Sequence, residues 1–129
     1  KTFYIPRYMQ LTWANVRSVC KSFGLDIGTF DTLEELNAFI DMAKKQVPTL
    51  SGSYHVGGVT LTPKSPNDWF WVTTGEKIDY QLPWASGQPD TFNDVQYCLR
   101  IIVPGYTFDD FDCDHVSGSI KFVCQEIEK

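Results

Sequence analysis

Hydrophobic positions follow a helical period near the start of the chain. Thr12 is a suitable N-cap, and Trp13, Val16 and Cys20 then fall on one face of a helix. Gly24 is a natural residue at which such a helix ends. The pattern therefore predicts a first amphipathic helix shortly after residue 12.

A second helical pattern begins at Thr32-Leu33-Glu34-Glu35, which has the form of a capping box. The helix should end near Lys45, before Pro48. Its apolar positions at helical spacing are Leu33, Leu36, Phe39, Ile40 and Ala43.

From residue 50 onward, short apolar or aromatic runs are separated by Gly, Pro, Asn and Asp, which is typical of strands and loops. Strands are predicted at 54–61, 69–73, 98–103 and 120–125, with Ile120, Phe122 and Cys124 pointing inward in the last. Between them, residues 62–97 hold three of the four tryptophans but little periodicity, which favours an ordered, ligand-bearing loop region. Helices followed by strands predict an α+β fold in a single domain, 1–129.

Composition and charge limit the class of function. With 129 residues and 43% hydrophobic content, the chain can bury one core. Its net charge of −5 argues against nucleic-acid and anionic-membrane binding, because both need a clustered basic face. Because there is no run of 18 apolar residues, we expect no membrane insertion. The start is not signal-like, so we expect that a targeting peptide has been removed. Together with the cysteine content, this predicts a secreted, extracellular domain.

The four cysteines indicate disulfides formed in an oxidising compartment, since no pair has the two-residue spacing of a zinc or redox motif. The nested pairing of Cys20 with Cys124 and of Cys98 with Cys113 is the simplest, although four cysteines allow three connectivities. Under this pairing the two bridges would contribute about 4.7 and about 3 kcal/mol in the chain-entropy model.

Side chains with carboxylate or amide oxygens gather in the last third of the chain. They are Gln88, Asp90, Gln96, Asp109 and Asp110. Calcium takes six to eight such oxygens, so the group is a candidate calcium site. The other open interpretation is a solvated acidic turn over residues 109–114.

An EF-hand loop can be excluded on the sequence. Asp110, Asp112 and Asp114 imitate the opening of such a loop. The required glycine at position six is His115, however, and the required glutamate at position twelve is Lys121. Both the turn residue and the closing ligand are missing.

The order of motifs along the chain resembles that of a C-type lectin domain. The matching motifs are Trp13-Ala14 before Cys20, Val56-Gly57-Gly58, Trp69-Phe70-Trp71, Trp84-Ala85-Ser86-Gly87-Gln88-Pro89-Asp90, Phe108-Asp109-Asp110-Phe111-Asp112-Cys113 and Phe122-Val123-Cys124. The match runs from about residue 3 to 126. Within this family, the chain most resembles the small secreted lectins of invertebrates such as insects.

The resemblance implies a double-loop fold with two helices flanking small antiparallel sheets, the nested disulfides, and one calcium ion that binds sugar hydroxyls directly. It implies as metal ligands Gln88, Asp90, Gln96, Asp109 and Asp110. Pro89 is expected to be cis, so that the side chains on either side of it point at one ion. A second calcium site of the family is not expected, because the stretch from Thr60 to Pro66 lacks the acids it needs.

Two ligand positions depart from the family pattern. Gln96 stands where Glu is usual, and Asp109 stands where Asn is usual. The two changes compensate in charge, so Asp90, Asp109 and Asp110 still supply three negative charges. We therefore expect calcium to bind with a Kd on the order of 10⁻⁴–10⁻³ M, as in extracellular modules.

The resemblance also bears on which sugar binds. Gln88-Pro89-Asp90 has the order of the galactose type, and Phe92 could pack against the apolar face of galactose. The implied sugar-binding residues are Gln88, Asp90, Phe92, Gln96 and Asp109. In the family, four of the ligands form two pairs of an acid and an amide, and galactose binders reverse only the first pair. This chain reverses both pairs, which restores a symmetric order that is closer to the mannose or fucose type.

The leading hypothesis is an extracellular, innate immune lectin that binds glycans ending in galactose or N-acetylgalactosamine in the presence of calcium, with oligomers or a partner lectin supplying avidity. The alternative is a calcium-independent protein-interaction module on the same fold. An enzyme is not expected, because neither His55 nor His115 has a nucleophile near it in the sequence. His55 is interpreted as a structural histidine.

Overall fold

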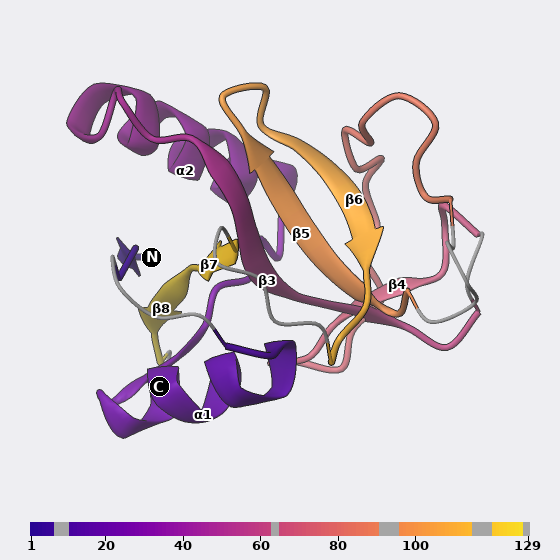
Figure 1. Cartoon of the computed structure of the whole chain (residues 1–129), viewed down its shortest axis with the longest axis horizontal. Helices are drawn as coiled ribbons and strands as arrows, with labels where there is room; N and C mark the ends of the chain where they lie inside the picture. Colours follow the sequence, from indigo (N-terminus) through magenta and orange to yellow (C-terminus); the bar gives the residue numbers. More distant parts are fainter. Residues whose placement is uncertain (7–10, 63–64, 91–95, 115–119, 128–129) are drawn as a thin grey trace.

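Two helices and eight strands make up the described part of the chain (Figure 1). The structure is a computed structural model that describes residues 1–6, 11–62, 65–90, 96–114 and 120–127. The elements in chain order are β1 (Phe3–Tyr4), α1 (Trp13–Ser22), β2 (Leu25–Ile27), α2 (Leu33–Gln46), β3 (Gly52–Thr60), β4 (Trp69–Trp71), β5 (Cys98–Val103), β6 (Thr107–Phe111), β7 (Ile120–Phe122) and β8 (Cys124–Glu126).

Helix α1 begins and ends as its sequence predicts. The Thr12 hydroxyl accepts a hydrogen bond from the N–H of Asn15, which satisfies one of the amides left free in a first helical turn. Val16 and Cys20 are buried, and Gly24 follows the helix with a φ of 76°. The predicted apolar face is therefore the buried face.

Helix α2 also has its predicted N-cap, with the Thr32 hydroxyl accepting from the N–H of Glu35. The other half of the capping box differs, because the Glu35 carboxylate accepts from the N–H of Asp31 instead of Thr32. Leu33, predicted to be part of the apolar face, is 45% exposed. The buried positions of this helix are Leu36, Phe39 and Ala43.

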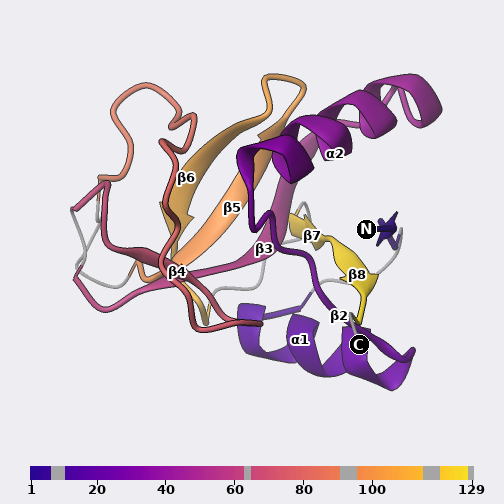
Figure 2. The same ribbon diagram turned by 180° about the vertical axis from the view of Figure 1, so that it is seen from behind.

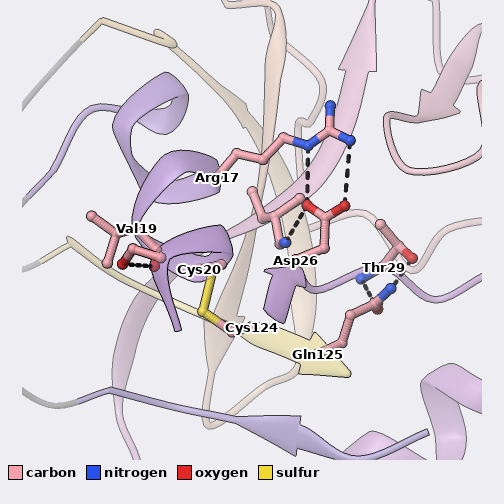
Figure 3. Close-up of a disulfide and its surroundings, with 9 residues drawn as sticks. Arg17, Val19, Cys20, Asp26, Thr29, Cys124 and Gln125 are labelled. Atoms are coloured by element: carbon pink, nitrogen blue, oxygen red, sulfur yellow. Dashed lines mark hydrogen bonds and ion pairs between the residues drawn. A yellow bond between two sulfur atoms is a disulfide. The ribbon is translucent and has the colours of Figure 1, made fainter. Parts of the chain in front are cut away.

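The two ends of the chain meet in a small antiparallel sheet with the order β1-β8-β2. Figures 1 and 2 show both termini beside β8. The disulfide Cys20–Cys124 joins α1 to β8, and Arg17 on α1 forms an ion pair of 3.0 Å with Asp26 on β2 (Figure 3). These contacts fix α1 against the sheet.

The larger sheet has the order β4-β3-β5-β6, and β7 pairs with β3 in the parallel direction. Strand β6 was not predicted, because two adjacent acids interrupt its apolar pattern. The predicted strand 120–125 is divided into β7 and β8 at Val123, so the C-terminal segment belongs to both sheets. Strands β1 and β2 are too short to show a periodicity in the sequence.

Most of the core lies between α2 and the larger sheet, where Phe30, Phe39 and Phe108 are fully buried or nearly so. A smaller cluster around Val16 and Phe122 lies under α1. Both predicted disulfides are present, Cys20–Cys124 and Cys98–Cys113. The predicted α+β arrangement of two helices and small antiparallel sheets is confirmed.

The described part of the long loop region, residues 65–90, packs onto this core. Trp69 and Trp71 are buried, and the ring of Trp84 lies 5.5 Å from that of Trp69. The Tyr80 hydroxyl donates a hydrogen bond of 2.6 Å to the carbonyl of Phe30. Aromatic side chains therefore hold the irregular backbone in place. Neither helix in the described part of the chain is long and apolar enough to cross a membrane.

Candidate functional site

The loop that carries Gln-Pro-Asp, residues 88–90, follows a segment that is joined to β6. The N–H of Phe108 donates to the carbonyl of Pro83 across 2.9 Å, and the N–H of Ala85 donates to the carbonyl of Phe108 across 2.8 Å. Because Phe108 is fully buried, this junction is anchored in the core. It brings residues 88–90 beside the acidic pair on β6.

Residues 88–90 contact β6 directly. The Gln88–Pro89 peptide bond is cis, as the sequence resemblance implied, and the N–H of Asp90 donates to Oδ1 of Asp110 across 3.1 Å. Oε1 of Gln88 is buried and has no hydrogen-bond partner among the described residues. A buried acceptor without a donor costs free energy, and a bound cation would satisfy it. The site therefore fits a calcium ion, because such an ion would bind this Gln88 oxygen, which is unpaired among the described residues.

Gln96 and Asp110 lie at the same end of the hairpin formed by β5 and β6. Gln96 precedes β5 and is 8% exposed, while Asp110 near the end of β6 is 2% exposed. The disulfide Cys98–Cys113 closes this end of the hairpin. The structure thus brings Asp90 into contact with Asp110, with Gln88 two residues before Asp90 in the loop and Gln96 at the same end of the hairpin as Asp110.

Asp109 is placed differently from the other predicted ligands. In β6 it lies opposite Arg100 of β5, whereas Asp110 lies opposite Leu99, so the two acids point to opposite faces of the sheet. Nε of Arg100 donates to Oδ1 of Asp109 across 3.0 Å, and Nη2 donates to Oδ2 across 2.6 Å. Both carboxylate oxygens of Asp109 are therefore engaged by a guanidinium.

Within the described part of the chain, no group of three or more acid, histidine or cysteine side chains is arranged to hold a metal ion. A calcium ion at this place would therefore depend on the amide oxygens of Gln88 and Gln96 as well as on carboxylates. The predicted sugar-contacting residue Phe92 lies outside the described residues. His55, interpreted as structural, is 1% exposed and lies in β3.

Arg100 is the site residue that sequence reasoning missed. Its position could have been found from the turn at Pro104-Gly105, which separates two apolar stretches and so predicts a hairpin. Counting backward and forward from that turn pairs Arg100 with Asp109, as the structure shows. Because Asp109 and Asp110 interrupt the apolar pattern, the second strand of this hairpin, β6, was not predicted.

A cavity in the described part of the chain lies away from these residues. It has a volume of about 590 Å³ and lies between β1, the C-terminal end of α2 and β3, with Met42, Tyr54 and Lys121 in its lining. A smaller cavity of about 290 Å³ is lined by residues 66–67, 69 and 77–82. Neither of these cavities is lined by a residue of the candidate site.

No family model matches the chain, but curated relatives do. The lectin subunit alpha of Sarcophaga peregrina is 23% identical over 130 residues, which cover 97% of this chain and 44% of that protein. The galactose-binding C-type lectin isoform of Pseudechis australis is 26% identical over 117 residues, which cover 88% of this chain and 70% of that protein. The chain thus spans less than half of the first relative. These relatives are lectins, a class of carbohydrate-binding proteins that are not enzymes.

Solved structures share the architecture at low sequence identity. The carbohydrate-recognition domain of a human scavenger receptor C-type lectin superposes with a TM-score of 0.74 at 21% identity, covering 98% of this chain and 90% of that one. C-type lectin CEL-I of Cucumaria echinata gives 0.70 at 18% identity, covering 95% and 86%. The C-type lectin domain of murine dendritic cell inhibitory receptor 2, solved in complex with an N-glycan, gives 0.73 at 19% identity, covering 98% and 90%. The fold of this chain is the C-type lectin fold.

Proposed function

We propose that the chain binds carbohydrate through one calcium ion held by Gln88, Asp90, Gln96 and Asp110. The observation that carries this proposal is the buried Oε1 of Gln88, which has no hydrogen-bond partner among the described residues. It belongs to the loop that the Asp90 N–H joins to Asp110. A buried acceptor oxygen without a donor, in a loop that contacts a carboxylate, is an arrangement that a hard cation stabilises.

The residues around the ion would also select the sugar. When bound, calcium supplies a Lewis acid to which two sugar hydroxyls can bind as ligands. A carboxylate such as that of Asp90 accepts a hydrogen bond from a hydroxyl, whereas the amide of Gln88 donates one. The order of acid and amide along residues 88–90 therefore fixes the orientation of the hydroxyl pair.

Terminal galactose or N-acetylgalactosamine is the preferred ligand in this proposal. The order Gln88-Pro89-Asp90 supports it, and the Pseudechis australis relative is named a galactose-binding lectin. The amide at Gln96 and the acid at Asp109 reverse the second pair as well, which favours mannose or fucose instead. A direct comparison of galactose and mannose resins decides between the two.

The test is retention on galactose and mannose resins, with calcium and with EDTA. We expect retention in calcium, release by EDTA, and loss of retention in Asp90→Ala. Asp112→Asn is the matched control, since it removes an acid of the same segment whose side chain accepts from the N–H of Asp114. Binding that persists in EDTA, or an Asp90→Ala variant that binds as well as the parent, would contradict the proposal.

A calcium-independent protein-interaction module is the second candidate function. The Arg100–Asp109 ion pair favours it, because one predicted ligand is already held by a cation of the protein itself. A ligand that binds only the folded state must raise the Tm. No change in Tm at about 10 mM calcium, well above the expected Kd, would favour this second function.

The setting proposed for either function is extracellular. Two disulfides are stable in an oxidising compartment, and the matched relatives are lectins. Because single sugar sites are weak, recognition of clustered glycans would require oligomers of this chain or a partner lectin. A role in innate immune recognition is part of the same proposal.

A further inference from the structure

Arg100 of β5 is held in place by two residues of β6, Asp109 and Phe111. Its guanidinium forms two hydrogen bonds with the Asp109 carboxylate, at 3.0 and 2.6 Å. Its Cζ atom lies 3.6 Å from the centre of the Phe111 ring, which places a cation over an aromatic face. The pair is sheltered, with side-chain exposures of 14% for Arg100 and 9% for Asp109.

This pairing changes the charge that a calcium ion would meet. Asp90, Asp109 and Asp110 carry three negative charges, but the guanidinium beside Asp109 neutralises one of them. Calcium affinity depends on the number of charged ligands. A metal at the site must therefore either displace a sheltered, forked ion pair or bind without the Asp109 carboxylate.

We propose that Arg100 lowers the calcium affinity of the site by competing with the metal for the carboxylate of Asp109. This inference rests on the proposed function and assigns a role to a residue that is itself no ligand. The competitor is part of the fold, since the β5–β6 register places Arg100 directly opposite Asp109. Strand β6 is at the edge of the larger sheet, so an ion beside that edge can be approached from both faces of the strand. Removing the guanidinium frees the carboxylate that neighbours Asp110 in the sequence.

The experiment is calcium titration calorimetry on the whole chain, with Arg100→Met as the test variant. Met keeps a long apolar side chain against Phe111 but cannot engage the carboxylate. We expect it to bind calcium about tenfold more tightly than the parent, in line with the effect of ligand charge on affinity. Arg100→Lys, which keeps the charge but loses the fork, should lie between the two.

Arg17→Met is the matched control. Arg17 forms the same kind of forked pair, with Asp26 at 3.0 and 3.3 Å, but between α1 and β2 (Figure 3). The Arg17→Met substitution changes the net charge by the same amount as Arg100→Met, but it should leave the calcium affinity at the parental value. An equal gain in both variants would show a general charge effect and overturn the inference.

A second pair of variants tests whether Arg100 acts through Asp109. In an Asp109→Asn background, Arg100→Met should give little or no further gain in calcium affinity. A full gain in that background would overturn the inference, because competition for the carboxylate would then be irrelevant. Thermal unfolding in EDTA checks that each variant is folded, and Arg100→Lys remains informative if Arg100→Met does not fold.

The outcomes also separate this inference from the proposed function. If the parent binds calcium and Arg100→Met binds it no more tightly, only the competition is wrong. If neither chain binds at about 10 mM calcium, both proposals are overturned. If only Arg100→Met binds, the competition is supported and the parent is the calcium-independent module.

Discussion

The N–H of Asp90 donates a hydrogen bond of 3.1 Å to Oδ1 of Asp110. This bond joins the loop of residues 88–90 to strand β6, although the two residues are 20 positions apart in sequence. Asp110 is 2% exposed, so its carboxylate acts within a sheltered environment. The same carboxylate positions the loop and is a proposed calcium ligand.

Two substitutions at Asp110 separate these roles. Asp110→Asn keeps an acceptor oxygen, so its stability in EDTA should stay close to that of the parent, while its calcium affinity falls at least about tenfold through loss of a charged ligand. Asp110→Ala removes the acceptor as well and should also cost about 0.5–1.5 kcal/mol of stability in EDTA. Urea unfolding and calcium calorimetry measure the two effects.

Asp114→Asn is the control for these variants, since Asp114 is an exposed acid just after the end of β6. It should leave both measurements unchanged. If Asp110→Asn bound calcium as tightly as the parent, Asp110 could not be a ligand. The proposed set of four side chains would then be wrong.

The helices could be predicted from the sequence because their signals are local. Thr12 and Thr32 lie at the N-caps, and the apolar period selects buried positions such as Val16 and Phe39. The positions of the four cysteines favoured the nested disulfides, and the resemblance implied both these and the cis Pro89. These features depend on short stretches of sequence or on a preserved order of motifs.

Strand β6 and the role of Arg100 depend instead on contacts between distant residues. Charged side chains disfavour a buried strand, and Asp109 and Asp110 are tolerated because Arg100 and the Asp90 N–H satisfy them. A count of acids along the sequence could not show that one of them is neutralised from the neighbouring strand. The charge of the candidate site was therefore overestimated by one.

The two disulfides should affect stability and calcium binding differently. Replacing both Cys20 and Cys124 with Ala opens a link of 104 residues and should cost about 4.7 kcal/mol, whereas replacing Cys98 and Cys113 opens one of 15 and should cost about 3 kcal/mol. Only the second pair closes the end of the hairpin that carries Gln96 and Asp110. Calcium affinity should therefore fall in the second variant and not in the first.

Urea unfolding and calcium calorimetry on the two double variants check this expectation. Each variant serves as the control for the other, because both lose one bridge and gain no charge. A loss of calcium affinity of equal size in both would mean that the hairpin end is not the site, or that the site responds only to global stability.

Gly58 is a position where β3 and β5 approach closely. A Cβ atom added there would lie 2.8 Å from Cβ and 2.6 Å from Cδ2 of Leu99, which is itself fully buried. Because Cβ of Leu99 moves only with its backbone, Gly58→Ala should destabilise the fold by about 1–3 kcal/mol. Urea unfolding measures the cost.

Gly105→Ala is the matched control for Gly58→Ala. A Cβ atom at Gly105 would meet nothing closer than the Thr107 hydroxyl oxygen at 3.7 Å, which is ordinary contact. Its stability should stay within about 1 kcal/mol of the parent, and a gain is expected if the unfolded chain loses freedom. Equal losses at both positions would contradict the packing explanation.

Tyr80 should make the fold sensitive to alkaline pH. Burial, followed by the negative charges of Asp31, Glu35 and Asp79, raises the pKa of the Tyr80 hydroxyl well above its usual value of about 10. Above pH 10 the unfolded chain therefore releases a proton that the folded chain keeps. The contribution of Tyr80 is full below pH 10 and decreases as the pH rises toward the folded-state pKa.

Urea unfolding between about pH 9 and pH 11 tests this expectation in the parent and in Tyr80→Phe. Tyr80→Phe should lose about 1 kcal/mol at neutral pH, because its hydrogen bond to the Phe30 carbonyl is gone, but its stability should fall less steeply above pH 10. The difference in slope can reach at most about 1.4 kcal/mol per pH unit. Tyr4→Phe, which removes a hydroxyl from a residue that is 44% exposed, should follow the parental slope. If Tyr80→Phe followed it too, burial of the Tyr80 hydroxyl would not be a source of alkaline instability.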